Sequence, residues 1–271
     1  MFGKITIGLM LILIVSLMSS YSSWAELNIE RLSKTEIKHV QDILQKLLPL
    51  IQERQKKENL ATLAFSELYA PLSKDDQNFL KQFQGLDAKV LGVKIPFREI
   101  ATGKEDLVVI RDQQIRSKDP KTGEFKKKWL TPQFLPKNVY EHYKAIMKTL
   151  KKDLGKQLYV DSGYRSSAYQ LYLLVFYLQN HDYSIHETVK FVALPGYSEH
   201  GSPSHQAIDF INENGIDGEN NPAEFEALEE YEWLLKNAKK FDFVLSYPKN
   251  APNAITFEPW HWRFEPNPKK N

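Results

Sequence analysis

The stretch Glu258-Pro259-Trp260-His261-Trp262-Arg263-Phe264 gives the clearest indication of the fold of this 271-residue chain. A turn-forming proline followed by a short aromatic run is typical of a short strand, here Trp260–Phe264. Three similar strands are predicted over Gln157–Asp161, Gln206–Ile211 and Phe241–Tyr247. Helices are predicted over Pro136–Leu154, Ser166–Gln179 and Pro222–Phe241. Short strands with irregular connections indicate an α+β fold, with a small antiparallel sheet and flanking helices.

The N-terminal part of the chain has a helical pattern from Leu27 to about Gln84. Apolar residues recur at steps of three and four, at positions 37, 40, 43, 44, 47 and 51. Ser33 with Glu36, and Ser73 with Asp76, have the spacing of helix N-terminal capping boxes. We predict that residues 26–105 form a helical segment that packs against or positions a catalytic domain over residues 106–271.

Residues 117–128 contain a proline, a glycine and five lysines and indicate an exposed loop or hairpin tip. These lysines could attract anionic cell-wall polymers, but a solvated surface is the favoured interpretation.

The first 25 residues have the order of a secretory leader. Lys4 precedes an apolar run from Ile5 to Met18, and a small-polar stretch ends at Ala25. We predict cleavage after Ala25, a secreted or periplasmic location, and no membrane span in the mature chain. An uncleaved N-terminal anchor is the alternative.

The composition limits the chemistry that the chain can perform. It contains no cysteine, so any metal site must use His, Asp and Glu side chains. The formal net charge of +2 and the absence of a long basic stripe argue against nucleic acid as a partner.

Three short stretches concentrate the residues that carry chemistry. They are Ser162 to Ser166, Gly196 to Asp209, and Glu258 to His261. A hydrolytic zinc needs three protein ligands and an open position for water, and His200, Asp209 and His261 would supply these ligands. Asp209 could instead form a salt bridge or cap a turn.

Two further residues in these stretches are candidates for catalysis. Glu258 precedes His261 by three positions and could accept a proton from a metal-bound water, or it could be merely exposed. Arg165 follows a Ser-Gly-Tyr turn and could hold an oxyanion or a terminal carboxylate, or form a structural salt bridge.

Together these motifs resemble the zinc peptidases that include VanY-type D-alanyl-D-alanine carboxypeptidases, L,D-carboxypeptidases and the hedgehog domain. The pattern is a Ser-Gly-Tyr-Arg-Ser turn, Ser-x-His with a strand Asp, and Glu-x-x-His, and it covers about Thr131 to Glu265. The resemblance implies a hedgehog/D-Ala-D-Ala peptidase-like fold, zinc on His200, Asp209 and His261, Glu258 as base and Arg165 near the oxyanion. It also implies that three residues line the substrate pocket, namely Ser198, Tyr164 and Gln170.

The substrate that the resemblance implies is a peptidoglycan stem peptide, which would lose its C-terminal D-alanine at a D,D or L,D bond. The alternatives are a peptidoglycan endopeptidase and a non-catalytic zinc-containing cell-wall binding protein. Glu258 argues against the binding protein, because binding needs no base.

The spacing of the middle motif departs from that family. Eight residues separate His200 from Asp209, where the family usually has six. This insertion makes His205 a rival ligand, since a side chain four positions before Asp209 on a strand shares its face. We favour His200, because Tyr197 and Ser198 match the family around it.

Overall fold

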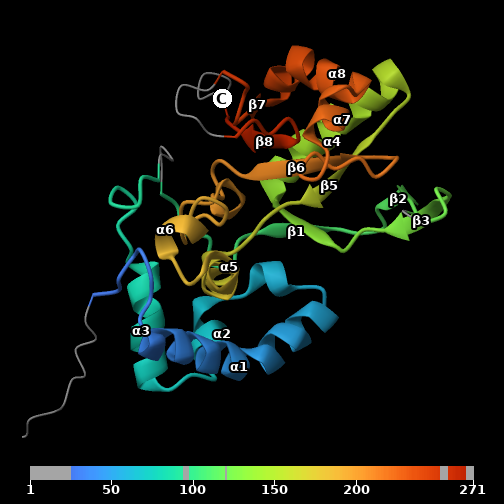
Figure 1. Ribbon diagram of the computed structural model, residues 1–271. Helices are drawn as coiled ribbons and strands as arrows, with labels where there is room; N and C mark the ends of the chain where they lie inside the picture. Colours follow the sequence, from blue (N-terminus) through green and yellow to red (C-terminus); the bar gives the residue numbers. More distant parts are fainter. Residues whose placement is uncertain (1–25, 94–97, 120, 251–255, 267–271) are drawn as a thin grey trace, which may run out of the picture.

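The computed structural model of the protein describes residues 26–93, 98–119, 121–250 and 256–266. The predicted leader over residues 1–25 lies outside them. Helices and short antiparallel strands form two layers, and the predicted α+β class is confirmed. Figure 1 shows the N-terminal helices at the bottom and the main sheet with its covering helices at the top. Within the described ranges, no helix has both the length and the apolar character needed to cross a bilayer.

The lower layer begins with the predicted N-terminal helices. They are α1 (Lys34–Lys56), the 3₁₀ helix η1 (Leu60–Thr62), α2 (Phe65–Tyr69) and α3 (Lys74–Gln84). α1 and α3 follow Ser33 and Ser73, and each serine forms a capping box with the acidic residue three positions later. Both capping boxes agree with the sequence prediction.

The apolar faces of these helices pack around a helix from the second half of the chain. This helix, α5 (Ser167–Tyr177), continues into η2 (Leu178–His181), and after a turn α6 (Ile185–Thr188) follows. One core cluster contains Val40 of α1, Phe79 of α3 and Leu171 of α5, all fully buried. Residues 26–93 and the helices that follow the Ser162–Ser166 turn therefore share a single hydrophobic core.

The upper layer contains a four-stranded antiparallel sheet with the order β5-β6-β8-β7. The strands are β5 (Leu158–Ser162), β6 (Ala207–Asn212), β7 (Phe243–Leu245) and β8 (His261–Phe264), close to the four predicted ranges. A second core cluster joins this sheet to α4 (Lys137–Leu154) and α8 (Glu229–Asn237).

One predicted helix is divided in the structure. The range Pro222–Phe241 forms α7 (Pro222–Glu226), α8 and η4 (Ala238–Phe241). The break falls at Leu228, whose extended backbone (φ −73°, ψ 140°) cannot continue a helix.

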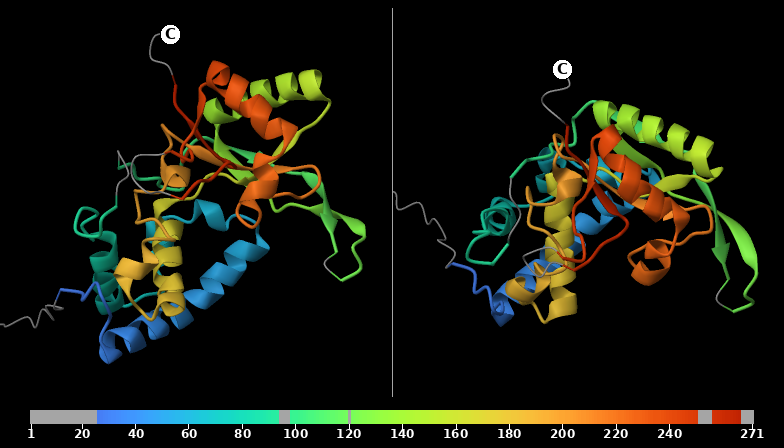
Figure 2. Two further views of the ribbon diagram at one scale, coloured as in Figure 1. Left: turned by 45° about the horizontal axis from the view of Figure 1, so that its top comes forward. Right: turned by 90° about the horizontal axis from the view of Figure 1, so that it is seen from above.

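Two smaller ribbons complete the upper layer. β1 (Leu107–Ile110) pairs with β4 (Gln133–Pro136), and β2 (Gln114–Lys118) pairs with β3 (Phe125–Trp129). The β2–β3 hairpin projects from the body of the molecule in all the views of Figures 1 and 2. It occupies the stretch that the sequence predicts as an exposed loop or hairpin tip.

Candidate metal centre

Two side chains of the candidate site come from neighbouring strands of the main sheet. Ile208 and Phe210 on β6 point into the core, so Asp209 points to the opposite face. Asp209 lies directly opposite His261 of β8 in the strand register. The strand pairing therefore brings one carboxylate and one imidazole together, on the face of the sheet that turns away from α4 and α8.

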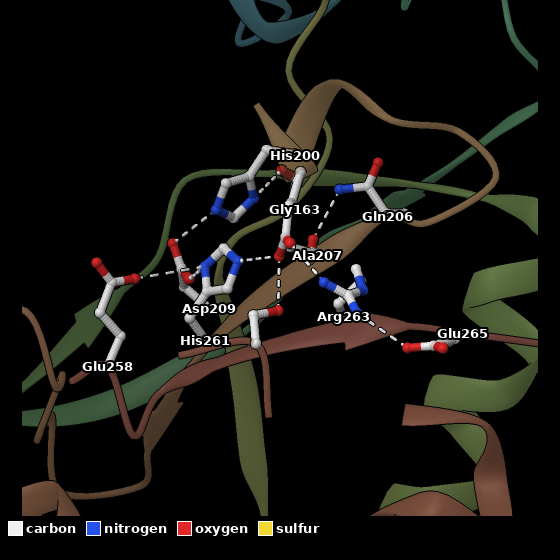
Figure 3. A network of polar contacts seen from close by, with 11 residues as sticks. Gly163, His200, Gln206, Ala207, Asp209, Glu258, His261, Arg263 and Glu265 are labelled. Atoms are coloured by element: carbon white, nitrogen blue, oxygen red, sulfur yellow. Dashed lines mark hydrogen bonds and ion pairs between the residues drawn. The ribbon is translucent and has the colours of Figure 1, made fainter. Parts of the chain in front are cut away.

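The third side chain, His200, comes from a loop. It lies in the one-turn 3₁₀ helix η3 (Glu199–Gly201) and is almost completely buried. Its Nδ1 lies 2.8 Å from the carbonyl oxygen of Gly163, and its own carbonyl accepts a hydrogen bond from the Arg165 backbone N–H. Its Nε2 lies 3.0 Å from Asp209 Oδ2 (Figure 3). The Gly163 contact favours a proton on Nδ1, which leaves the Nε2 lone pair directed at Asp209.

These three residues fit a metal ion. One ligand atom from each of His200, Asp209 and His261 lies within 4.8 Å of the other two, a grouping found only once among the described residues. Two imidazoles and one carboxylate are a donor set suited to zinc and leave a fourth position open for water. The structure thus brings together the three predicted ligands.

The charges at this site also favour a cation. Burial alone would lower the pKa of His261, but the carboxylates of Asp209 and Glu199 on its two sides raise it to about 10. Asp209 Oδ1 lies 2.7 Å from Nδ1 and Glu199 Oε2 lies 2.9 Å from Nε2. Without a metal, a proton on His261 compensates these carboxylates; a divalent cation would replace that proton on Nδ1.

Glu199 lies on the far side of His261 from the metal position and is itself firmly held. Its carboxylate accepts hydrogen bonds from Ser246 Oγ at 2.6 Å and from Arg263 at 2.7 Å. Burial opposes ionisation, but these partners and His261 lower the pKa of Glu199 to about 2. A carboxylate that holds the second nitrogen of a metal-bound histidine fixes its ring orientation. In the sequence, only the position of Glu199 next to His200 indicates this role, because its partners lie 47 to 64 positions away along the chain.

Glu258 lies at the edge of the cluster, immediately before the turn into β8. Its Oε2 is 3.9 Å from His261 Nδ1 (Figure 3). Its backbone N–H donates to the Tyr247 carbonyl. Burial raises the pKa of Glu258 to about 7; His261 opposes this, while Asp209 adds to it. The carboxylate is thus close enough to act on a water at the cluster, with a basicity suited to proton transfer near neutral pH.

Arg165 follows the Ser-Gly-Tyr turn as predicted, and its positive charge acts on His200. Burial lowers the pKa of His200, and the Arg165 guanidinium contributes to the decrease. The Nε atom of Arg165 is buried and has no hydrogen-bond partner among the described residues. Among the described residues, the arginines that pair with a carboxylate are Arg54, Arg111 and Arg263, and not Arg165.

Two of the three predicted pocket residues make contacts within the protein. The Tyr164 hydroxyl donates to the Glu105 carboxylate and accepts from the Gly103 N–H at 2.8 Å. Gln170 is buried, and its Nε2 donates to the Ala193 carbonyl at 2.8 Å, while its Oε1 has no partner among the described residues. Their predicted contact with substrate stays a prediction.

The remaining two candidates lie on the loop around η3. Ser198 is buried directly before this helix. His205, the rival ligand, has its Nδ1 3.5 Å from Glu99 Oε1 and is not part of the three-residue cluster. The structure therefore places His200, and not His205, beside Asp209.

A segment from the N-terminal part of the chain holds the loop that carries His200. We call residues 98–105 the support segment. The Glu99 N–H donates to the Gly196 carbonyl, and the Glu99 carboxylate accepts from Ser202 Oγ at 2.6 Å and from the Ser204 N–H at 3.0 Å. Glu99 therefore contacts the loop on both sides of η3, at Gly196 before it and at Ser202 and Ser204 after it.

The support segment also holds the turn that carries Arg165. Ala101 exchanges hydrogen bonds with Ser167, whose N–H donates to the Ala101 carbonyl and whose hydroxyl accepts from the Ala101 N–H. The turn and the loop touch directly, because a Cβ on Gly201 would lie only 2.9 Å from the Arg165 carbonyl oxygen. Glycine at 201 permits this close approach.

Comparison with known proteins adds evidence from sequence. Residues 132–267, half of the chain, match the model of the VanY family, described as D-alanyl-D-alanine carboxypeptidase. YodJ of Bacillus subtilis (strain 168) is 31% identical over 134 residues, which are 48% of this chain and 46% of YodJ. The D-alanyl-D-alanine carboxypeptidase of Enterococcus faecalis (strain ATCC 700802 / V583) is 38% identical over 80 residues, 29% of this chain and 26% of that relative. The matches thus span less than half the length of either relative.

Two solved structures illustrate the similarity of this chain to known proteins. The LdcB LD-carboxypeptidase is 27% identical with a TM-score of 0.43, covering 59% of this chain and 67% of its own. VanYB in complex with D-alanine-D-alanine is 21% identical with a TM-score of 0.41, covering 62% and 82%. On the strength of the family match over residues 132–267, the chain belongs to the VanY family of D-alanyl-D-alanine carboxypeptidases.

Proposed function

We propose that this protein is a zinc-dependent carboxypeptidase that removes the C-terminal D-alanine from peptidoglycan stem pentapeptides. The observation that carries the proposal is the grouping of His200, Asp209 and His261 beside Glu258, in a chain of the VanY family. The leader predicted for residues 1–25 would deliver the enzyme to the secreted or periplasmic compartment where peptidoglycan lies.

His200 Nε2, His261 Nδ1 and an Asp209 oxygen would hold the zinc. When bound, zinc would supply Lewis-acid chemistry and lower the pKa of a bound water towards about 7. Glu199 would keep the His261 ring in its binding orientation through the hydrogen bond at Nε2.

Glu258 would move the proton in the reaction. It would accept a proton from the water that adds to the scissile carbonyl carbon, and pass it to the amide nitrogen as the C–N bond breaks. The products are a shortened peptide with a new carboxylate and free D-alanine. Arg165, whose buried Nε has no hydrogen-bond partner among the described residues, would bind the negative oxygen that develops on the carbonyl or the terminal carboxylate of the substrate.

Mass spectrometry of soluble stem peptides tests this function. The zinc-loaded protein should convert a pentapeptide ending in D-alanyl-D-alanine to the tetrapeptide, and a chelator or the Glu258→Gln substitution should stop the conversion. Conversion of tetrapeptide to tripeptide instead would show an L,D specificity. Cleavage of a cross-linked dimer alone would show an endopeptidase, and an unchanged mixture of all three peptides would contradict peptidase function.

A further inference from the structure

The β2–β3 hairpin is joined to the strands that carry the candidate site. The Arg116 N–H donates to the carbonyl of Glu213, just beyond β6. At the base of the hairpin, Gln113 exchanges two hydrogen bonds with the backbone of Val160 on β5. The hairpin root is therefore fixed beside β5 and β6, while its tip projects away from the body (Figures 1 and 2).

The two faces of this hairpin differ. Ile115 is buried and lies close to Gly215, so its face packs against the body at the root. Side chains alternate along a strand, so Phe125, Lys127 and Trp129 share the opposite face. Phe125 is 57% exposed and Trp129 is 61% exposed. Two large aromatic side chains left in solvent on one narrow face indicate a surface that contacts a partner.

The hairpin is also strongly basic. Residues 114–129 contain six basic and two acidic side chains, a formal charge of +4, whereas the entire chain carries +2. Arg116 lies directly opposite Lys127 in the strand register, and like charges in such positions destabilise the pair. Neither side chain forms an ion pair with a carboxylate in the described ranges. An anionic partner on this face would relieve the repulsion.

We propose that the outward face of the β2–β3 hairpin binds polymeric peptidoglycan. Sugar rings of the glycan strand would stack on Phe125 and Trp129, and stem-peptide carboxylates would pair with Arg116 and Lys127. Four residues of extended strand separate the two aromatic side chains by about 13 Å, longer than one sugar ring. This inference rests on the proposed function, since it concerns how the polymer reaches the same site.

The position of the hairpin favours the glycan polymer over a lipid surface as the partner. The root lies beside the strands of the metal centre, because Gln113 exchanges hydrogen bonds with Val160 of β5, and Ser162 of β5 lies opposite Asp209 in the strand register. A polymer lying along the hairpin from tip to root would therefore lead towards the residues that act on its stem peptides. A lipid bilayer carries no stem peptides, so this alignment with the site would have no function if the partner were a bilayer.

Sedimentation with insoluble purified peptidoglycan tests the proposal, using the full mature protein. The double substitution Phe125→Ala with Trp129→Ala should weaken binding by about tenfold or more, since it removes both side chains on which the sugar rings would stack. Lys127→Glu should weaken binding several-fold, with a smaller effect in high salt. Phe191→Ala, which removes a 74% exposed aromatic side chain elsewhere, is the matched control and should bind as the wild type does.

Hydrolysis of soluble pentapeptide separates docking from catalysis. Both hairpin variants should cleave the soluble peptide at the wild-type rate and release less alanine from the insoluble polymer. Unchanged sedimentation of both variants would overturn the proposal, as would an equal loss on soluble and insoluble substrates. Binding of the wild type to phosphatidylglycerol vesicles tests the lipid alternative. If the double substitution abolishes that binding and leaves sedimentation with peptidoglycan unchanged, the partner is a lipid surface. If the wild type releases no alanine from soluble peptide, the proposed function fails, while the sedimentation results still decide the docking.

Discussion

The two halves of the candidate metal centre are held in different ways. Asp209 and His261 are opposite residues of paired strands, so the hydrogen bonds of the sheet fix their separation. His200 and Arg165 lie on a loop and a turn, which rest on the support segment through Glu99 and Ala101. The difference shows that the strand-held half depends on local sheet structure, whereas the loop-held half depends on contacts with residues 66 to 105 positions earlier in the chain. We infer that the N-terminal part of the chain serves to position the loop-held half.

The largest expected effect concerns chemistry on the strand-held side. Glu258→Gln keeps the shape of the side chain but removes the base, so kcat should fall by about 10²–10⁴-fold. Zinc affinity and melting temperature should change little, because Glu258 is not among the three ligands. Steady-state kinetics with a zinc titration measures both quantities. Turnover near the wild-type rate would remove Glu258 from the mechanism.

The next effect concerns the loop-held side. Arg165→Ala should remove about 2–4 kcal/mol of transition-state stabilisation if the guanidinium stabilises an oxyanion. This loss is measured as a fall in kcat/KM. Arg165→Lys should recover only part of this, because a lysine lacks the planar fork that binds two oxygens. Thermal melting of both variants is the control, and it should stay close to the wild type. A large loss of stability with normal turnover of the folded fraction would identify Arg165 as structural.

Glu199 connects the two halves, because it lies on the loop and holds His261 on the strand. Glu199→Gln should lower zinc affinity by about 10–100-fold, as the loss of such a partner does in other metal sites. Competition with a chromophoric chelator measures the Kd. Ser246→Ala removes only one hydrogen bond to the same carboxylate and should have a smaller effect. Equal zinc affinity in Glu199→Gln and the wild type would show that the strand alone positions His261.

The smallest effect is expected at the support segment. Glu99→Gln weakens the contacts to Ser202 and Ser204, and should cost about 1 kcal/mol of unfolding free energy and lower kcat/KM several-fold. Burial would raise the pKa of Glu99, but these hydrogen bonds lower it below its ordinary value of about 4.3. A depressed carboxyl pKa contributes stability above the unfolded-state pKa that is lost as pH falls.

The stability difference between wild type and Glu99→Gln should therefore shrink as the pH drops below about 4. Denaturant melts at pH 7 and pH 3.5 measure it. A difference that is the same at both pH values would mean that the ionised carboxylate does not hold the loop.

The contrast between the two halves also explains what could be predicted from the sequence. The strands that carry Asp209 and His261 follow from short local patterns, and the structure has them close to the predicted positions. The capping boxes at Ser33 and Ser73 are local too. By contrast, nothing near Tyr164 in the sequence indicates that its hydroxyl contacts Gly103 and Glu105, since the support segment carries no motif.

Two other features depended on long-range contacts. The network around Glu199 joins η3, β8 and Ser246, which meet only when the sheet has formed and the loop has packed on it. The sequence predicts a solvated surface for the basic stretch at residues 117–128, and only the strand register shows that Phe125, Lys127 and Trp129 share one exposed face. The periodicity of apolar residues predicts where helices and strands lie in the sequence, but tertiary packing determines which of them come into contact.

We propose that one metal ion binds where the two halves meet, on His200, Asp209 and His261. Anomalous diffraction at the zinc absorption edge, from crystals of the zinc-loaded protein, tests it most directly. We predict one strong peak at about 2.0–2.2 Å from His200 Nε2, His261 Nδ1 and an Asp209 oxygen. A peak coordinated by His205 in place of His200, or no peak at this cluster, would contradict it.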